Sequence, residues 1–141
     1  MNKNKGFSLV ELIVVVAIMA VLVGILAPAY LSYVEKTRRG TDENTAEEVR
    51  HSIEIAAADI CVYDELKGGA TFGFSQDTAL AGPYSGKTAF TEAMADVYSD
   101  KTFQIKSKKY NGKTYTVTVT ANTDSGSGAA LTVTGAWGGG N

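Results

Sequence analysis

The sequence predicts an α+β fold in which one long N-terminal helix packs on a small antiparallel β-meander of about three strands. Three observations lead to this prediction. Residues 12–34 contain no charged residue, an amphipathic pattern with spacings of three and four residues runs from Ala46 to Tyr63, and threonines alternate with apolar residues near the C-terminus. Glycines cluster after Lys67, which favours turns and strands in the C-terminal half.

The bulk composition fits one domain with a modest core, because a chain of 141 residues is too short for two comfortable domains. A net charge of -2 and a pI near 5.4 argue against broad electrostatic binding to nucleic acid or anionic lipid. Cys61 is the single cysteine, so no disulfide can form within the chain. Because isolated cysteines are usually buried, we expect Cys61 in the core, with a bond between chains as the alternative.

The uncharged run is long enough to cross a membrane. As a helix its 23 residues would span about 34 Å at roughly 1.5 Å per residue. A cleavable secretory signal normally has a shorter apolar stretch, although the alanines around Pro28 leave a cut near Ala29 open on pattern alone. Basic residues lie on both sides of the run, so their distribution does not determine its orientation.

Glu11 lies about one turn into this apolar helix. A charge at the centre of a bilayer costs about 2.5–3.5 kcal/mol on insertion scales, so an ionisable residue in such a segment predicts a functional partner. The surrounding residues, Lys5-Gly6-Phe7-Ser8-Leu9-Val10-Glu11-Leu12 and the apolar stretch after them, resemble the class III signal of type IV pilins and related pseudopilins. The resemblance covers about the first fifty residues and is closest to a type IV major pilin without a C-terminal disulfide.

The resemblance implies that a prepilin peptidase cuts between Gly6 and Phe7 and methylates the new amino group of Phe7. It also implies that Glu11 assists the docking of subunits in a filament. The expected organisation is a leader peptide (1–6), a transmembrane and polymerisation helix (7–34), an amphipathic helix (35–67) and a globular head with a loop, a short helix and an antiparallel sheet (68–141).

The chemistry of the cut agrees with that role. Cleavage would leave a cation on Phe7 at the end of an apolar helix, and Glu11 of a neighbouring subunit could neutralise it away from water. A buried pair of this kind is weak evidence for stability, but it rejects slipped packings because an unpaired buried charge is penalised. The alternative is a plain signal anchor in which Glu11 reaches the lipid headgroups.

Pro28 predicts a kink in the helix. Proline removes one backbone hydrogen bond and its ring clashes with the carbonyl of Gly24. The kink is either a point at which the helix loosens or a static bend.

The rest of the chain predicts a small head. Gly68-Gly69 predicts the end of the amphipathic helix, and Asn111-Gly112 predicts a hairpin turn. The other expected elements are a loop at 70–86, a helix at 88–98 with Phe90, Met94 and Val97 on one face, strands around Phe103 and Ile105, at 115–121 and at 131–137, and a turn at 122–128.

No catalytic, cofactor or metal site is expected, so the chain is predicted not to be an enzyme. Residues 81–88 satisfy a relaxed phosphate-loop pattern, but no buried strand precedes them and Pro83 has no amide hydrogen to donate. His51 is the single histidine, which leaves a zinc site or a catalytic triad unsupported. Three aspartates are too sparse for a calcium loop: Asp59, Asp64 and Asp124.

A group of lysines near two tyrosines forms the one local basic cluster: Lys101, Lys106, Lys108, Lys109 and Lys113. Such a cluster can bind DNA, but lysines around a hairpin more often protect an edge strand from pairing. Nucleic acid is therefore a possible but unsupported partner.

The resemblance implies a structural subunit of a bacterial type IV pilus that serves adhesion, motility or aggregation. Such a subunit is a single-pass membrane precursor before it enters an extracellular filament. Its expected partners are other pilin subunits, the prepilin peptidase, the assembly machinery in the membrane, and the lipid bilayer before assembly. The alternative function is a pseudopilin of a type II secretion or competence DNA-uptake system. A membrane-anchored hydrolase is the third hypothesis, and no catalytic constellation supports it.

Overall fold

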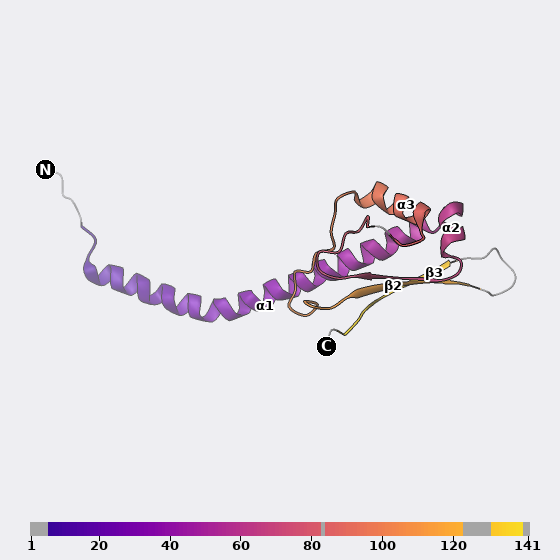
Figure 1. The fold of residues 1–141 in the computed structure, drawn as a ribbon. Helices are drawn as coiled ribbons and strands as arrows, with labels where there is room; N and C mark the ends of the chain where they lie inside the picture. Colours follow the sequence, from indigo (N-terminus) through magenta and orange to yellow (C-terminus); the bar gives the residue numbers. More distant parts are fainter. Residues whose placement is uncertain (1–5, 83, 123–130, 140–141) are drawn as a thin grey trace. The chain divides into compact units, whose positions relative to one another are not determined.

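A computed structural model describes residues 6–82, 84–122 and 131–139 (Figure 1). The chain divides into an N-terminal unit, Met1–Thr37, and a C-terminal unit, Arg38–Asn141. The elements are helices α1 (Leu9–Ala56), α2 (Ile60–Leu66) and α3 (Thr88–Tyr98) and strands β1 (Ala70–Phe74), β2 (Tyr115–Ala121) and β3 (Leu131–Trp137). A long N-terminal helix and a three-stranded antiparallel sheet confirm the predicted α+β class.

The core of the C-terminal unit lies on both sides of the second half of α1. Figure 1 shows this half of the helix between α3 and the sheet. Val49 and Ile53 are buried in one hydrophobic cluster with Val117 and Val119 of β2 and Phe90 of α3. Removal of these apolar surfaces from water is the main force that holds the unit together.

The sheet has the strand order β1-β2-β3, and both pairings are antiparallel. Val117 of β2 lies opposite Phe72 on one side and Gly135 on the other. A Cβ atom at Gly135 would collide with the hydroxyl oxygen of Tyr115, so glycine leaves room there for the buried tyrosine ring. Helix α3 lies in the connection between β1 and β2, so no tight hairpin joins these strands.

The prediction of a loop over 70–86 is wrong at its start, because residues 70–74 form β1. Phe72 and Phe74 are buried in the core, whereas Thr71 and Gly73 on the other face are exposed. The glycine and threonine content resembled a loop, but pairing with β2 and burial of two aromatic rings override the local preference.

The strand predicted at Phe103 and Ile105 does not form. The amide of Phe103 donates to the carbonyl of Thr78 at 2.7 Å, and its carbonyl accepts from the amide of Asp77 at 2.9 Å. Phe103 is fully buried, and this burial explains the apolar signal without a strand. A turn with a positive φ of 74° at Gly112 does precede β2, but it closes no hairpin with residues 103–105. The turn predicted at 122–128 falls almost wholly outside the described residues.

The predicted amphipathic helix is interrupted after Ala56. The side chain of Asp59 accepts from the amide of Cys61 at 2.8 Å and starts α2 as a new helix. This restart changes the buried face, so Val62 and Leu66 enter the core while Ile60 is 75% exposed. The predicted end at Gly68-Gly69 is confirmed, and Gly69 has a positive φ of 85°.

Two residues predicted to be buried are exposed. Cys61 lies on the exposed face of α2 because the helix restart turns Val62 into the core in its place. Helix α3 has the predicted bounds and buries Phe90 and Met94, but Tyr98 rather than Val97 completes its buried face. The hydroxyl of Tyr98 lies 2.8 Å from that of Ser52 on α1, so the polar end of the ring has a hydrogen-bond partner.

Asp42 of α1 holds an irregular segment of the C-terminal unit in place. It is 1% exposed, and its two carboxylate oxygens accept from the amides of Lys106 and Ser107, each at 2.8 Å. Hydrogen bonds from backbone donors to a buried carboxylate are among the stronger ones in proteins. The helix and the segment that leads toward β2 are therefore joined at this point.

Substitution Asp42→Ala is expected to lower the free energy of unfolding by about 2–4 kcal/mol, because two amides would lose a charged acceptor. Chemical denaturation of the full chain in detergent measures the change. Asn44→Ala, at an exposed position of the same helix, is the control and should have little effect. Equal stability of the two variants would contradict this role of Asp42.

Glu65 of α2 caps the beginning of α3. Its carboxylate accepts from the amides of Ala89 and Phe90, each at 3.0 Å. Lys87, at the N-cap position of α3, makes no side-chain cap, and its amino group donates to the backbone carbonyl of Glu65. The hydrogen bonds from Phe90 and then Ala89 hold the pKa of Glu65 below its usual value.

Acidification is therefore expected to weaken the contact between α2 and α3. Because the folded pKa of Glu65 is depressed, its contribution is fully present above the unfolded pKa of about 4.3 and is lost as pH falls through the folded pKa. Thermal unfolding should show Glu65→Gln below wild type at about pH 7 and nearer to it at about pH 3. Glu92→Gln, at an exposed site of α3, is the control. A pH-independent deficit in Glu65→Gln would contradict the capping role.

Candidate functional site

The predicted cleavage junction lies just outside α1. Gly6 and Phe7 precede the helix, and Phe7 is 84% exposed. Leu12 donates its amide hydrogen to the carbonyl of Ser8 at 3.2 Å at the start of the helical hydrogen-bond pattern. A peptide bond in non-helical, exposed backbone is accessible to an enzyme, so the geometry is compatible with cleavage at this junction.

Glu11 lies in the first turn of α1 and is exposed. The first amides of a helix have no partner within the helix, and together with the helix dipole they favour a nearby negative charge. This placement gives the carboxylate a second physical reason to occupy its position, which the sequence analysis did not identify. The sequence does contain a sign that Glu11 lies in the first turn of a helix: Ser8, a common helix-capping residue, is only three residues before it.

The N-terminal part of α1 is apolar on all sides. Large apolar side chains are exposed from Phe7 to Tyr33, including Leu9 at 73% and Ile25 at 68%. By length and composition this helix could cross a membrane, and none of its most apolar 18-residue window is buried in the structure. A helix without a polar face requires lipid or other helices around it.

Gly24 and Pro28 both lie inside α1, which continues past them. Gly24 presents open space, with no atom within 4 Å of the position that a Cβ would occupy. The kink predicted at this pair stays a prediction.

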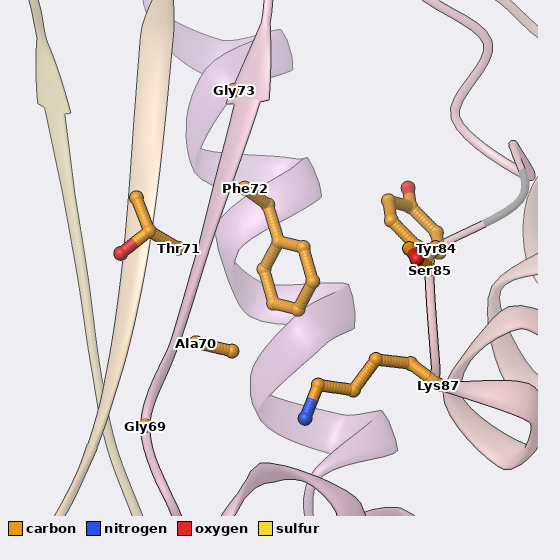
Figure 2. Close-up of a pocket in the computed structure, with 8 residues that line it drawn as sticks. All are labelled: Gly69, Ala70, Thr71, Phe72, Gly73, Tyr84, Ser85 and Lys87. Carbon is orange, nitrogen blue, oxygen red and sulfur yellow. The ribbon is translucent and has the colours of Figure 1, made fainter.

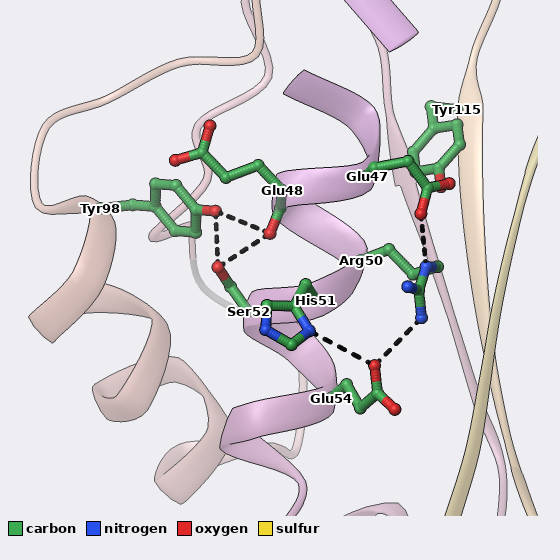
Figure 3. A network of polar contacts seen from close by, with 8 residues as sticks. All are labelled: Glu47, Glu48, Arg50, His51, Ser52, Glu54, Tyr98 and Tyr115. Carbon is green, nitrogen blue, oxygen red and sulfur yellow. Dashed lines mark hydrogen bonds and ion pairs between the residues drawn. The ribbon is translucent and has the colours of Figure 1, made fainter. Parts of the chain in front are cut away.

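The charged face of α1 forms ion pairs within the helix (Figure 3). The guanidinium of Arg50 lies 2.8 Å from Glu47 and 3.1 Å from Glu54, and the hydrogen bond with Glu47 raises the pKa of Arg50. His51 is exposed, and its Nδ1 atom lies 3.5 Å from Glu54. Exposed pairs of this type contribute at most about 1 kcal/mol each. This arrangement therefore provides a polar helix surface.

The residues that resembled a phosphate loop form part of a shallow pocket of about 380 Å³ (Figure 2). Tyr84, Ser85 and Lys87 line it on one side and residues 69–73 on the other. The amides at the start of α3, which would have to bind a phosphate, are already occupied by the carboxylate of Glu65. Pro83 lies outside the described residues.

Two of the aspartates considered for calcium, Asp59 and Asp64, have structural partners. Asp59 caps α2, and Asp64 lies 2.8 Å from the amino group of Lys67. Asp124 lies outside the described residues. Within the part of the chain that the structure describes, no group of three or more His, Cys, Asp or Glu residues could hold a metal ion.

The lysine cluster does not protect the edge strand for which it was considered, because no strand forms at 103–105. Lys109 lies 3.7 Å from the carboxylate of Glu43 and 4.7 Å above the ring of Tyr110. The hydroxyl of Tyr110 donates to Glu43 at 2.5 Å. Part of the cluster therefore contacts α1 near the beginning of the C-terminal unit.

Comparison with known proteins gives a match at the N-terminus and partial matches beyond it. The family described as "Prokaryotic N-terminal methylation motif" matches residues 1–27. The chain is 32% identical to the type IV major fimbrial protein FimA of Dichelobacter nodosus over 64% of its length and 55% of the relative. It is 34% identical to the type IV major alpha-pilin of Moraxella bovis over 63% of its length and 50% of the relative.

A third relative, the prepilin peptidase-dependent protein D of Escherichia coli strain K12, is 36% identical over 50% of the chain and 48% of the relative. The chain thus spans about half the length of the relatives that it matches. No solved structure matches.

Proposed function

We propose that this chain is a type IV pilin, a subunit of a type IV pilus that polymerises through the N-terminal part of α1; the match of residues 1–27 to the N-terminal methylation motif and the similarity to two pilins support the proposal. The observation that carries this proposal is an unburied, wholly apolar helix with an acid in its first turn, directly preceded by the exposed Gly6–Phe7 bond. Lipid around this helix before assembly and copies of the same helix after assembly would both keep it out of water.

Cleavage provides the step between these two environments. In the precursor, the nitrogen of Phe7 belongs to a neutral peptide bond. After a prepilin peptidase cuts that bond, the nitrogen becomes an amine that is cationic at neutral pH, and N-methylation keeps its charge. The subunit then carries a cation and the Glu11 carboxylate about one turn apart.

The two charges are complementary between subunits. A neighbour shifted along the helix axis presents the cation of Phe7 to Glu11, which neutralises both groups as they leave water. Loss of one partner leaves a buried charge and costs about 3–5 kcal/mol, so the pair selects one axial register. The filament would serve adhesion, motility or aggregation, and the precursor would be a single-pass membrane protein before its extracellular assembly.

A pseudopilin of a secretion or DNA-uptake system is the second candidate, because the relative from Escherichia coli is named only for its dependence on prepilin peptidase. The relatives named as a major fimbrial protein and a major alpha-pilin favour the pilus. Deletion of the gene separates the two: loss of long surface filaments supports the pilus, whereas loss of secretion or transformation with filaments intact supports the pseudopilin.

Substitution Gly6→Val is expected to block processing, because a branched side chain beside the cut would obstruct a peptidase selective for a small residue. Intact-mass analysis of the membrane fraction should find the uncut precursor, whereas the wild-type chain should begin at methylated Phe7. Asn4→Ala is the control within the leader. A mature chain that begins at Phe7 in Gly6→Val would contradict the proposed junction.

Substitution Glu11→Gln is expected to leave processing intact and to reduce filament yield by about tenfold or more, because an uncompensated cation would be buried in every subunit contact. Immunoblots of sheared filaments and of the membrane pool measure the two quantities separately. Ser8→Ala, in the same N-terminal segment, should retain most of the yield. Normal filaments from Glu11→Gln would contradict the charge-pair mechanism.

A further inference from the structure

The C-terminal unit has an apolar groove at the junction of α1 and α3. In the described part of this unit, the strongly exposed large apolar side chains are Ile55, Ile60 and Val97. Ile55 and Val97 line a groove of about 280 Å³, which is completed by Ser52, Ala56, Ala93 and Asp96. Val97 was predicted to share a face with Phe90 and Met94, but it is exposed at this groove instead of buried with them.

The groove has a well-anchored floor. The hydroxyls of Ser52 and Tyr98 lie 2.8 Å apart, and both contact the backbone carbonyl of Glu48 (Figure 3). These contacts join α1 to α3 directly below the groove. Its shape is therefore set before any partner arrives, which reduces the entropic cost of binding.

The rim of the groove is acidic. Asp96 belongs to its lining and is exposed, and Glu92 lies one turn earlier on the same helix and is also exposed. Glu54 is next to Ile55 in sequence and forms an ion pair with Arg50. A partner for this surface would combine apolar stems with positive charge.

The same chain carries a surface of that chemistry at the start of the C-terminal unit. Basic residues of α1 and of the segment before β2 lie there. We call this surface the basic end, and it consists of Arg38, Arg39, Lys106, Lys108 and Lys109. Asp42 binds the backbone at Lys106, and Glu43 pairs with Lys109, which ties this segment to α1. Lysine and arginine side chains cover apolar surface with their methylene stems while their charged ends remain in water.

We infer that the groove lined by Ile55, Val97 and Asp96 binds the basic end of another copy of this chain. The stems of the basic side chains cover the two apolar residues, and Asp96 faces Lys106 of that copy. This inference rests on the proposed function, because the polymer supplies the second copy. The competing occupant of the groove is a protein of another kind. Crosslinking and charge exchange distinguish it from a second copy of this chain.

The geometry of the contact suits a filament. Two different surfaces meet, so the contact is heterologous and repeats without closing into a dimer. Thirteen residues of α1 separate Asp42 from Ile55, which corresponds to about 20 Å along the helix at about 1.5 Å per residue. A copy with the same orientation and an axial shift of about 20 Å, a different neighbour from the one whose Phe7 pairs with Glu11, would bring its basic end level with the groove.

Cysteine crosslinking tests the contact in filaments of the full chain. In a Cys61→Ser background, Val97→Cys combined with Lys106→Cys should give a ladder of disulfide-linked multimers on a non-reducing gel after mild oxidation. Each single cysteine variant should remain monomeric. Filaments without a ladder, or dimers from Val97→Cys alone, would overturn the inference and leave the proposed function intact. Absence of filaments from the wild-type chain would instead overturn the proposed function.

Charge exchange provides an independent test. Asp96→Lys and Lys106→Glu should each lower filament yield by about tenfold, since like charges would face each other across the contact, and the double variant should recover most of the yield. Asp64→Lys makes the same change of charge on an exposed face of α2 and is the control. A double variant no better than either single variant would overturn the inference, as would an equal loss in the control.

Discussion

The apolar surface of α1 between Leu9 and Tyr33 is the constraint on which the other properties of this chain depend. These side chains are exposed in the isolated subunit, and each one left in water forfeits the free energy that burial provides, about 1.5–3 kcal/mol for a large aliphatic residue. Within the described residues of the N-terminal unit, no element covers them. The chain can therefore persist only where lipid or neighbouring helices surround this segment.

The positions of the charges determine whether lipid or neighbouring helices can surround this segment. A carboxylate in the first turn is tolerated near a membrane interface, where water and headgroups remain within reach. In a bundle of apolar helices it requires a cation, which the proposed cut after Gly6 would create on Phe7. The proposed function thus couples processing to assembly, because an uncut precursor would have an acid to bury and no amine beside it. The C-terminal unit has the opposite character, with buried hydrogen bonds at Asp42, a cap at Glu65 and a closed core.

Prediction from the sequence succeeded where one local pattern determined one element. The uncharged run predicted the helix, and the alternation of threonine with valine predicted β2 and β3. It failed where contacts between residues far apart in the sequence determine the structure. The sequence of β1 contains glycine and threonine and forms a strand only because β2 pairs with it. Phe103 fills the core but belongs to no strand, so its apolar character reflects burial and did not indicate a strand.

The contacts of the carboxylates were the least accessible to sequence reasoning. Asp42 binds amides 64 and 65 residues away, and Glu65 caps a helix more than twenty residues later, so no local spacing signals either contact. Asp59 was a recognisable helix-capping residue, but the apolar stripe around it suggested an unbroken helix. Cys61 and Val97 are exposed for related reasons: in each case the next residue in sequence, Val62 or Tyr98, occupies the core.

A cryo-EM reconstruction of filaments sheared from cells would test the central claim most directly. The account predicts that residues 9–34 form the interior of the filament and that the methylated amine of Phe7 lies within about 4 Å of Glu11 of an adjacent subunit, as in an ion pair. A filament with this helix on its outer surface, or with Glu11 facing water and far from any amine, would contradict it.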